Sequence, residues 1–306
     1  CGQWGISYPG FYSAAGMIDA HPALTAVSPQ APVSDWWFDD FHHHGAFFLA
    51  HAFRFLYLFG QPRPLPTEMF AHRFQFPTPD GYEFFLEMGP LKQANLDHMR
   101  DRVEFWNQFA VHPNYDAFWQ SRNIIPHLKH CAPAVMTVGG WFDAEDLYGP
   151  LKIYRAVEAN NPDVFNILVM GPWAHGHWAR TEGSRLGNAF FDAKTAEFYR
   201  AEIEFPFFEH FLRDAEDPRL PEAYVFETGT NVWQQFRHWP PEAVEPYELR
   251  FAPDGALSLA AGAADDQASD DETSEESQPD SKVADDESPD EPPLTFDEFV
   301  SDPSRP

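Results

Sequence analysis

Short apolar runs alternate along the chain with stretches of helical periodicity. Buried strands are predicted at 24–27, 134–138 and 167–170, where mostly apolar residues stand together and glycine or proline follows. Helices are predicted at 11–20, 45–57, 150–160 and 192–213. Alternation of helices with short buried strands is typical of an α/β fold with a parallel sheet, so we expect that class here.

A different pattern separates the first predicted strand from the second. Residues 60–79 are rich in proline, which breaks regular structure. From Tyr82 to His127 the apolar positions are helical in spacing and mostly aromatic. An insertion between two sheet segments is where a helical lid would be placed. The expected segments are fold core at 1–57, helical lid at 58–127 and fold core at 128–218.

After Pro218 the pattern changes to short strand candidates such as 223–226, which predicts a separate β domain over 219–306. Residues 265–291 within it are acidic and of low complexity, with thirteen Asp or Glu against one Lys. Such a segment cannot bury enough apolar surface to fold, so we expect a solvated, disordered insertion without catalytic content. The chain starts within a strand–turn–helix pattern and stops abruptly, so we expect a piece of a longer protein, truncated at both ends.

Composition narrows the class of partner. With 306 residues, 43% of them hydrophobic, the chain can bury a large core. Its 20 basic residues against 48 acidic ones give a net charge of −28, which argues against nucleic acid or an anionic membrane as partner. No apolar run of about eighteen residues occurs, so we expect no membrane insertion. Cys1 and Cys131 are too few for a disulfide framework.

Candidate chemistry begins in the first ten residues, Cys-Gly-Gln-Trp-Gly-Ile-Ser-Tyr-Pro-Gly. Ser7 follows a short strand candidate and precedes small and apolar residues, which is the pattern of a nucleophile elbow. In such an elbow a sharp turn from strand to helix raises a serine hydroxyl into a cleft, and glycines leave room for the backbone. The usual motif is G-x-S-x-G, but Pro9 stands at its second glycine and Gly10 one position later. A plain turn is the alternative interpretation.

Two later loops supply the partners that an activated serine needs. Gly-Gly-Trp-Phe-Asp-Ala-Glu-Asp, ending at Asp146, follows the second predicted strand, and Gly-Pro-Trp-Ala-His-Gly-His, ending at His177, follows the third. A histidine must take the serine proton, and a carboxylate must hold the imidazole in the right tautomer. The order serine, acid, histidine is that of α/β-hydrolases, and loops after parallel strands converge at one edge of the sheet. The residues alone leave Asp143, Glu145 and Asp146 open as the acid.

Other functions stay open on the same residues. His175 and His177 form an H-x-H pair, and with His42, His43 and His44 they could ligate the metal of a metal-dependent hydrolase. No acid-rich H-x-x-E-H arrangement accompanies them, and we expect neither a metal nor a cofactor. In a third hypothesis the chain, or its parent protein, is inactive and serves as a binding module.

Three motifs resemble those of one family. Gly-Ile-Ser-Tyr-Pro-Gly, Gly-Trp-Phe-Asp and Gly-Pro-Trp-Ala-His are similar to motifs of the cocaine-esterase-like hydrolases in the X-prolyl dipeptidyl-peptidase superfamily. That group includes α-amino acid ester hydrolases and glutaryl-7-aminocephalosporanic-acid acylases, and its elbow reads G-x-S-Y-x-G, which accounts for the displaced glycine. The resemblance covers most of 1–250. It implies an α/β-hydrolase fold followed by a jelly-roll domain, which would begin here from about residue 219.

The resemblance also implies roles for single residues. Ser7 matches the nucleophile, Asp143 the triad acid and His175 the base of a serine acyl hydrolase that cleaves esters or amides through an acyl-enzyme. The backbone N–H of Tyr8 matches one oxyanion donor, while the second donor of the family is a tyrosine hydroxyl upstream of the serine. X-prolyl dipeptidyl-peptidase activity is the alternative within the same fold.

A substrate preference is implied as well. In α-amino acid ester hydrolases three carboxylates bind the α-ammonium group of the substrate. Glu145 and Asp146 match two of them, and Asp40 matches the third across a one-residue alignment gap. We therefore expect a small-molecule ester or amide with a free α-amino group as partner; structural acids, solvated or salt-bridged, are the alternative. The resemblance implies a periplasmic or secreted location, and a homo-oligomer stays open.

Overall fold

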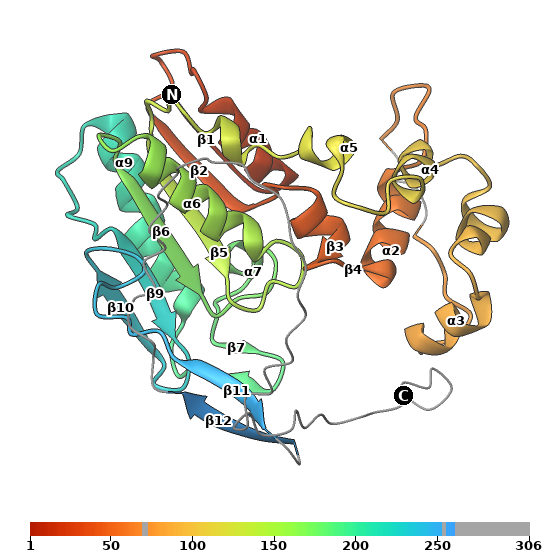
Figure 1. Ribbon diagram of the computed structural model, residues 1–306. Helices are drawn as coiled ribbons and strands as arrows, with labels where there is room; N and C mark the ends of the chain where they lie inside the picture. Colours follow the sequence, from red (N-terminus) through yellow and green to blue (C-terminus); the bar gives the residue numbers. More distant parts are fainter. Residues whose placement is uncertain (69–72, 253–254, 261–306) are drawn as a thin grey trace, which may run out of the picture. The chain divides into compact units, whose positions relative to one another are not determined.

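The computed structural model describes residues 1–68, 73–252 and 255–260. The chain divides into two compact units, Cys1–Pro241 and Glu242–Pro306. The first unit contains every residue of the predicted site, and its central element is a six-stranded sheet (Figure 1). No helix in the described ranges is both long and apolar enough to cross a membrane.

The central sheet is mostly parallel. In spatial order its strands are β1 (Gly2–Ser7), β2 (Ala26–Pro32), β5 (Ala134–Gly140), β6 (Asn166–Gly171), β9 (Ala223–Glu227) and β10 (Val232–Phe236). The first five run parallel, and β10 pairs antiparallel with β9 at one edge. The α/β class is therefore confirmed, as are the strands predicted at 134–138 and 167–170.

Alternating side chains of the strands fill a core on each face of the sheet. Along β5, Met136 and Val138 belong to one core, while Val135 belongs to the other. Helices α1 (Tyr8–Gly16) and α6 (Tyr148–Asn160) cover the Val135 face, and the helices after β6 cover the opposite face (Figure 1). Every residue of β5 and β6 is buried, which is the pattern of a sheet covered on both sides.

The helix predicted at 192–213 forms as three consecutive segments. After α7 (His177–Arg180) and the short strands β7 (Arg185–Leu186) and β8 (Ala189–Phe190) come α8 (Thr195–Phe198), the π-helical η4 (Tyr199–Glu204) and α9 (Phe205–Arg213). Pro206 has no N–H to close an ordinary helical hydrogen bond, and the wider turns lie directly before it. Tyr199, Ile203 and Phe207, four residues apart, are fully buried against the sheet.

Between β2 and β5 the chain forms a helical insertion, residues 37–127. Its elements are η1 (Trp37–Phe41), β3 (His42–His43), β4 (Ala46–Phe47), α2 (Leu49–Phe59), α3 (Gly81–Met88), η2 (Ala94–Met99), α4 (Glu104–Ala110), α5 (Ala117–Gln120) and η3 (Ile125–His127). The insertion has an aromatic core of its own, in which Phe53 of α2 contacts the rings of Phe74, Phe76 and Trp106. The described part of 60–79 contains no helix or strand, as predicted.

Two elements near the amino terminus differ from the prediction. The strand expected at 24–27 begins at Ala26 and runs to Pro32, because pairing with β1 on one side and β5 on the other holds this segment extended. The helix expected at 11–20 begins at Tyr8, directly after the turn. Pro9 fits the first helical turn, where a missing N–H leaves no intrahelical bond unmade.

The structure also moves the boundary expected at residue 218. Strand β9 pairs with β6, and its residues Ala223 and Val225 pack with Leu168 and Met170, so the central sheet continues past that point. The described residues of the second unit form one antiparallel hairpin, β11 (Glu248–Ala252) and β12 (Ala256–Ala260). The acidic insertion predicted at 265–291 lies outside the described residues, and the jelly-roll domain stays a prediction.

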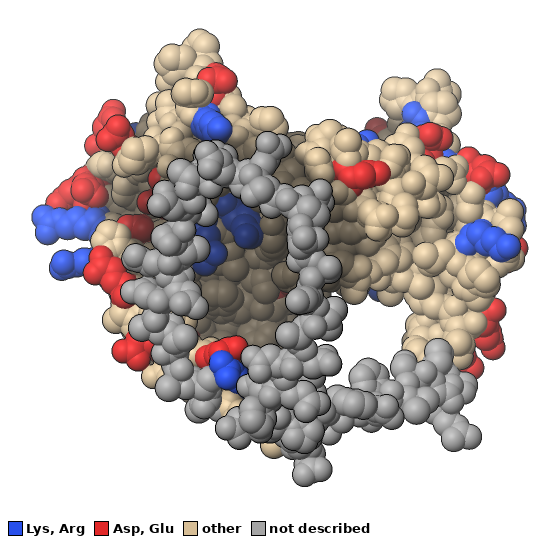
Figure 2. Space-filling model, viewed as in Figure 1, with Lys and Arg blue, Asp and Glu red and all other residues tan. Residues whose placement is uncertain are grey.

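Charged side chains are spread over the surface. On the face shown in Figure 2, acidic and basic side chains are interspersed rather than gathered by sign. Residues 265–291, with thirteen acids and one lysine, contribute much of the net charge of −28. The net charge of the described residues is therefore less negative than that of the whole chain.

Candidate active site

Ser7 is the last residue of β1, and α1 begins at the next residue. Its backbone angles, φ 70° and ψ −126°, lie in a region that L-residues rarely adopt, as expected for a sharp strand-to-helix turn. Neighbouring glycines make room for this turn. A Cβ on Gly5 would lie 2.4 Å from Cβ of Pro9, and one on Gly10 would lie 2.5 Å from the carbonyl oxygen of Gln30. The displaced glycine of the motif is thus required by the adjacent strand β2.

His175 and Asp143 form a close pair on the loops that follow β6 and β5. Nδ1 of His175 lies 2.8 Å from Oδ2 of Asp143, whose side chain is fully buried. Oδ1 of Asp143 accepts hydrogen bonds from the backbone N–H groups of Glu145 and Asp146, at 2.9 and 3.1 Å. Both oxygens of Asp143 are therefore engaged, and its orientation toward the imidazole is fixed.

The surroundings of His175 raise its basicity. Burial alone would lower its pKa, because a buried imidazolium loses hydration. The hydrogen bond to Asp143 and the negative charges of Asp143 and Glu145 outweigh burial, so the pKa of His175 is raised. Oε2 of Glu145 lies 3.6 Å from Nε2, the nitrogen that does not face Asp143. A raised pKa makes the imidazole a stronger base, which suits proton transfer from a hydroxyl.

Backbone contacts hold the aspartate loop against the histidine loop. The N–H groups of Trp141 and Phe142 donate to the carbonyl oxygens of Gly171 and Trp173, at 2.9 and 3.0 Å. A Cβ on Gly140 would lie only 2.2 Å from the carbonyl oxygen of Trp173, so this approach requires glycine. Because these contacts join the two loops, the carboxylate of Asp143 and the imidazole of His175 are held in a fixed relative position.

The histidine loop also lies near the strand that ends at Ser7. A Cβ on Gly176, the residue after His175, would lie 3.4 Å from Cγ2 of Ile6. Because β1, β2, β5 and β6 run parallel, the end of β1 and the two sequence-predicted loops lie at one edge of the sheet. The Ser7 hydroxyl makes no hydrogen bond to a described residue; in unliganded enzymes such hydrogen bonds are often long or poorly aligned.

Asp40, Glu145 and Asp146 form a carboxylate cluster beside this edge. Asp40 accepts a hydrogen bond from the Tyr8 hydroxyl at 2.8 Å, and its Oδ1 lies 3.7 Å from Nε2 of His51. Asp146 is 1% exposed, and neither of its oxygens has a hydrogen-bond partner among the described residues. Burial, reinforced by the negative charges of neighbouring acids, raises the pKa of Asp146 well above its usual range. Such a group is unfavourable unless a proton or a cation neutralises it.

Asp39, which precedes Asp40, has a structural position instead. Its Oδ2 accepts hydrogen bonds from the N–H and hydroxyl of Ser34 and from the N–H of Asp35, and its Oδ1 accepts from the N–H of Gly149 at 2.8 Å. These bonds tie η1 to the first turn of α6. Burial raises the pKa of Asp39 to about 7, although the hydrogen bonds oppose that shift. Of the Asp-Asp pair, Asp40 is therefore the one in contact with the elbow tyrosine.

One group of candidate metal ligands occurs within the described ranges. Single ligand atoms of Glu145, Asp146 and His175 lie within 4.8 Å of one another. His177 and the run at 42–44 do not belong to this group. The same imidazole belongs to the His175–Asp143 pair, and the same two carboxylates belong to the carboxylate cluster. A metal ion bound here would therefore compete with both for these side chains.

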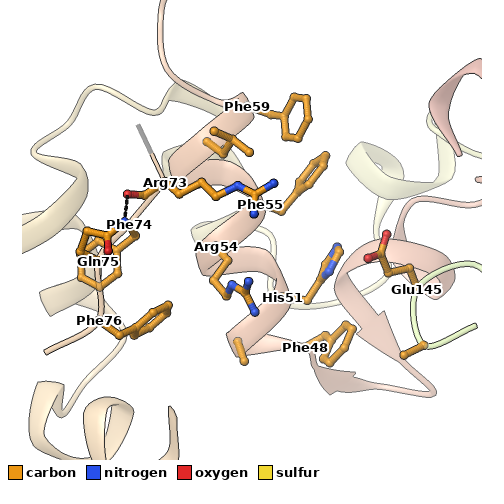
Figure 3. Close-up of a pocket in the computed structure, with 13 residues that line it drawn as sticks. Phe48, His51, Arg54, Phe55, Phe59, Arg73, Phe74, Gln75, Phe76 and Glu145 are labelled. Carbon is orange, nitrogen blue, oxygen red and sulfur yellow. Dashed lines mark hydrogen bonds between the residues drawn. The ribbon is translucent and has the colours of Figure 1, made fainter. Parts of the chain in front are cut away.

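Two pockets adjoin the site. One, of about 570 Å³, is lined by Tyr8, Trp36, Phe55 and Phe105, and the Tyr8 ring stacks on Trp36 with centroids 4.9 Å apart. The other, of about 540 Å³, runs past His51 along α2 (Figure 3). Apart from Tyr8 and Glu145, the lining residues stand in no sequence motif, because most of them reach the site through packing of the insertion. The one signal for them was the density of aromatic residues.

Comparison with known proteins settles the family. Residues 1–177, more than half of the chain, match the family model described as X-Pro dipeptidyl-peptidase (S15 family). The chain belongs to this family. The predicted resemblance is therefore confirmed, and the matched residues include Ser7, Asp143 and His175. A comparison with curated protein sequences gave no match.

Solved structures similar to this family member include two enzymes. An aminopeptidase from a marine sediment archaeon, Thaumarchaeota archaeon, has 32% sequence identity and a TM-score of 0.77 over 86% of this chain and 43% of its own. An α-amino acid ester hydrolase has 30% identity and a TM-score of 0.70 over 78% of this chain and 39% of its own. The chain thus spans less than half the length of either protein.

Proposed function

We propose that the chain carries the active centre of a serine acyl hydrolase that acts on esters or amides with a free α-amino group. The observation that carries the proposal is the His175–Asp143 pair, on two loops at the sheet edge where β1 ends at Ser7. A serine on a strained turn, an imidazole and a buried carboxylate are the parts that nucleophilic catalysis of acyl transfer needs. Membership of the family supports this reaction class.

The proposed reaction starts with attack of the Ser7 hydroxyl on the substrate carbonyl carbon. Nε2 of His175 takes the hydroxyl proton as the new C–O bond forms, and returns it to the leaving alcohol or amine as the old bond breaks. Asp143 stays ionised and holds Nδ1–H, while the backbone N–H of Tyr8 donates to the oxyanion. A water molecule, deprotonated by the same Nε2, then hydrolyses the acyl-enzyme and regenerates Ser7.

The carboxylate cluster is proposed to bind the α-ammonium group of the substrate. Support comes from Asp146, a buried carboxylate to which no described residue donates a hydrogen bond. An ammonium group would supply both the opposite charge and up to three donors. One similar structure is named an aminopeptidase and the other an α-amino acid ester hydrolase, and a free α-amino group is common to both names.

Two further features complete the proposal. Trp36 and Phe55 of the pocket beside Tyr8 would contact the acyl side chain, with the insertion acting as a helical lid.

X-prolyl dipeptidyl-peptidase activity is the alternative use of the same site, since the matching family is described by that activity. The two activities differ in the number of residues between the ammonium group and the bond that is cleaved.

Covalent labelling tests the nucleophile. A fluorophosphonate should form an adduct on Ser7, and Ser7→Ala should stay unlabelled. Ser184→Ala, which changes a serine of the β7 region outside the site, is the matched control and should label normally. An adduct at another residue, or none, would refute the proposal. A chelator should have no effect; activity that is lost on chelation and restored by zinc would favour the metal-dependent hydrolase.

A substrate pair tests the ammonium subsite separately. Phenylglycine methyl ester should be hydrolysed roughly a hundredfold faster than methyl phenylacetate, because the cluster would be left unpaired by the ester that lacks the amino group. Asp146→Asn should remove most of this preference. Equal kcat/KM values for the two esters in the wild-type chain would eliminate the subsite while leaving the nucleophile in place.

A further inference from the structure

The pocket along α2 has an electrostatic character of its own. Its volume, about 540 Å³, is in the range of small-molecule sites, and Glu145 and His51 connect it to the carboxylate cluster. Phenylalanines supply much of its wall: Phe48, Phe55, Phe59, Phe74 and Phe76. Few polar groups line the pocket, so each charged side chain in its wall should strongly affect which ligands bind.

Arg54 and Arg73 are the arginines that line this pocket. In Figure 3 the side chains of both arginines lie to the left of His51 and Glu145. No hydrogen bond or ion pair joins either guanidinium to a described residue; Gln75 donates to the backbone carbonyl oxygen of Arg73, not to its side chain. Both arginines are exposed, and they bring two positive charges to this pocket in a chain with 48 acidic residues against 20 basic ones.

The two ends of the pocket therefore differ in sign. Glu145, at the junction with the carboxylate cluster, is its one lining carboxylate among the described residues, and the arginines lie along α2 and the segment facing it. A guanidinium presents a planar fork of donors that matches the two oxygens of a carboxylate. Because Arg54 and Arg73 are exposed, water screens such a pair and its contribution to binding is modest. A ligand with an ammonium group at one end and a carboxylate at the other would complement both ends.

We propose that Arg54 and Arg73 bind a carboxylate of the substrate whose α-ammonium group lies at the carboxylate cluster, so that the site selects zwitterionic substrates. The inference rests on the proposed function and adds a second charged group to the substrate class. Two sources supply the same chemistry. The carboxylate can belong to the side chain of an acidic acyl residue, or to the free carboxyl terminus of a short peptide.

Binding to a Ser7→Ala chain tests the inference without turnover. Isothermal titration calorimetry would compare two ligand pairs that differ only in charge. Glutamic acid α-amide against glutaminamide tests the acidic side chain, and the dipeptide Phe-Ala against its carboxyl-terminal amide tests the free carboxyl terminus. We expect the carboxylate member of one pair to bind about tenfold more tightly, the effect of one charge-assisted hydrogen bond in a partly solvated pocket. The responding pair identifies the source.

Variants assign that preference to the two arginines. In the same Ser7→Ala background, Arg54→Gln and Arg73→Gln should each reduce the affinity ratio of the responding pair toward one, and Arg54→Lys should retain part of it because the charge stays. Arg63→Gln is the matched control, since Arg63 is an exposed arginine of the insertion that does not line the pocket, and it should keep the full ratio.

The outcomes separate this inference from the proposed function. Ratios near one for both pairs, or a ratio that survives both glutamine substitutions, would overturn the carboxylate site. Turnover of a neutral amino acid ester by the wild-type chain would at the same time show an intact catalytic centre. Failure of that turnover, with a charge preference that depends on the arginines, would instead refute the hydrolase and keep the carboxylate site.

Discussion

Tyr8 joins the nucleophile turn to the carboxylate cluster. Tyr8 is the next residue after Ser7, so its backbone N–H lies at the turn, and its side-chain hydroxyl donates a hydrogen bond to Asp40 at 2.8 Å. Burial, together with the charge of Asp40 and this hydrogen bond, raises the pKa of Tyr8 well above its usual range, so the hydroxyl stays protonated.

We expect Tyr8→Phe to reduce the preference for phenylglycine methyl ester over methyl phenylacetate roughly tenfold, because Asp40 loses its hydrogen-bond donor. Ratios of kcat/KM measure this, with Tyr12→Phe on the exposed side of α1 as control. An unchanged ratio would show that the hydroxyl does not position Asp40.

His175, the proposed base, should determine the acid limb of the pH profile. The base must be neutral to accept a proton, and its pKa is raised, so kcat/KM should increase with pH through a value above that of an ordinary histidine. Glu145→Gln removes one of the charges that raise this pKa and should move the limb to lower pH by about half a pH unit. Methyl phenylacetate is the substrate to use, because it has no amino group that titrates. Glu182→Gln, at an exposed glutamate paired with Lys194, should leave the limb unchanged. A limb that moves to higher pH in the Glu145 variant would contradict the assignment.

The sequence could predict the sheet edge at which Ser7, Asp143 and His175 lie, because Ser7 ends one strand and the other two residues stand on loops that directly follow two buried strands. It could not predict what surrounds them. The contact between Tyr8 and Asp40 depends on how the insertion returns to the elbow, and no local pattern encodes that path. The family resemblance supplied Asp40, whereas the arginine pocket had no counterpart in any motif.

At the scale of elements, β2 shows why strand ends were hard to predict. Pro29 and Pro32 argue against a central strand, since proline donates no ladder hydrogen bond. The strand nevertheless pairs with β1 along its length, and with β5 at Ala26, Val27 and Gln30. Burial between two neighbours outweighs local propensity here. Strands β5 and β6, with apolar runs and glycine ends, had no such conflict and were predicted.

The helical insertion should lose structure independently of the sheet, because it has a separate core. Phe53 is fully buried among aromatic residues of the insertion. Phe53→Ala should destabilise this core by about 3–5 kcal/mol, as large cavities do. Hydrogen exchange should accelerate from α2 to α5 and stay slow in β5 and β6.

Phe207→Ala is the matched control for that experiment. Phe207 of α9 is equally buried but packs against the sheet. Its replacement should accelerate exchange in the strands rather than in the insertion. If both variants accelerated exchange everywhere, the two cores would unfold as one cooperative unit and the prediction would be wrong.

At the scale of the whole molecule, Asp146 should reduce stability at neutral pH. Its pKa is raised in the folded chain, so the folded state binds this proton more tightly than the unfolded state does. Stability from this group is therefore complete at low pH and is lost as pH rises through the raised pKa. Asp146→Asn should increase the free energy of unfolding at pH 8 by about 1–2 kcal/mol and change it little at pH 4.

Thermal unfolding at the two pH values measures this effect. Asp163→Asn, at an exposed aspartate outside the site, should behave as wild type at both. If the Asp146 variant were less stable than wild type at pH 8, the ionised carboxylate would already be stabilised by neighbouring groups in the unliganded chain, and the prediction would be wrong. Unfolding of the first unit reports the change, since Asp146 lies within Cys1–Pro241.

The Asp146 carboxylate, 3.8 Å from Nδ1 of His175 but without a hydrogen-bond donor among the described residues, has a consequence beyond catalysis. A substrate that brings an ammonium group to it acts as a counterion, and a ligand that binds only the folded state stabilises that state by mass action. Proteases cleave chains that open transiently, so occupancy of the site would lengthen the lifetime of the protein. The supply of amino-bearing substrate would then govern how much of this protein persists, as well as how fast it works.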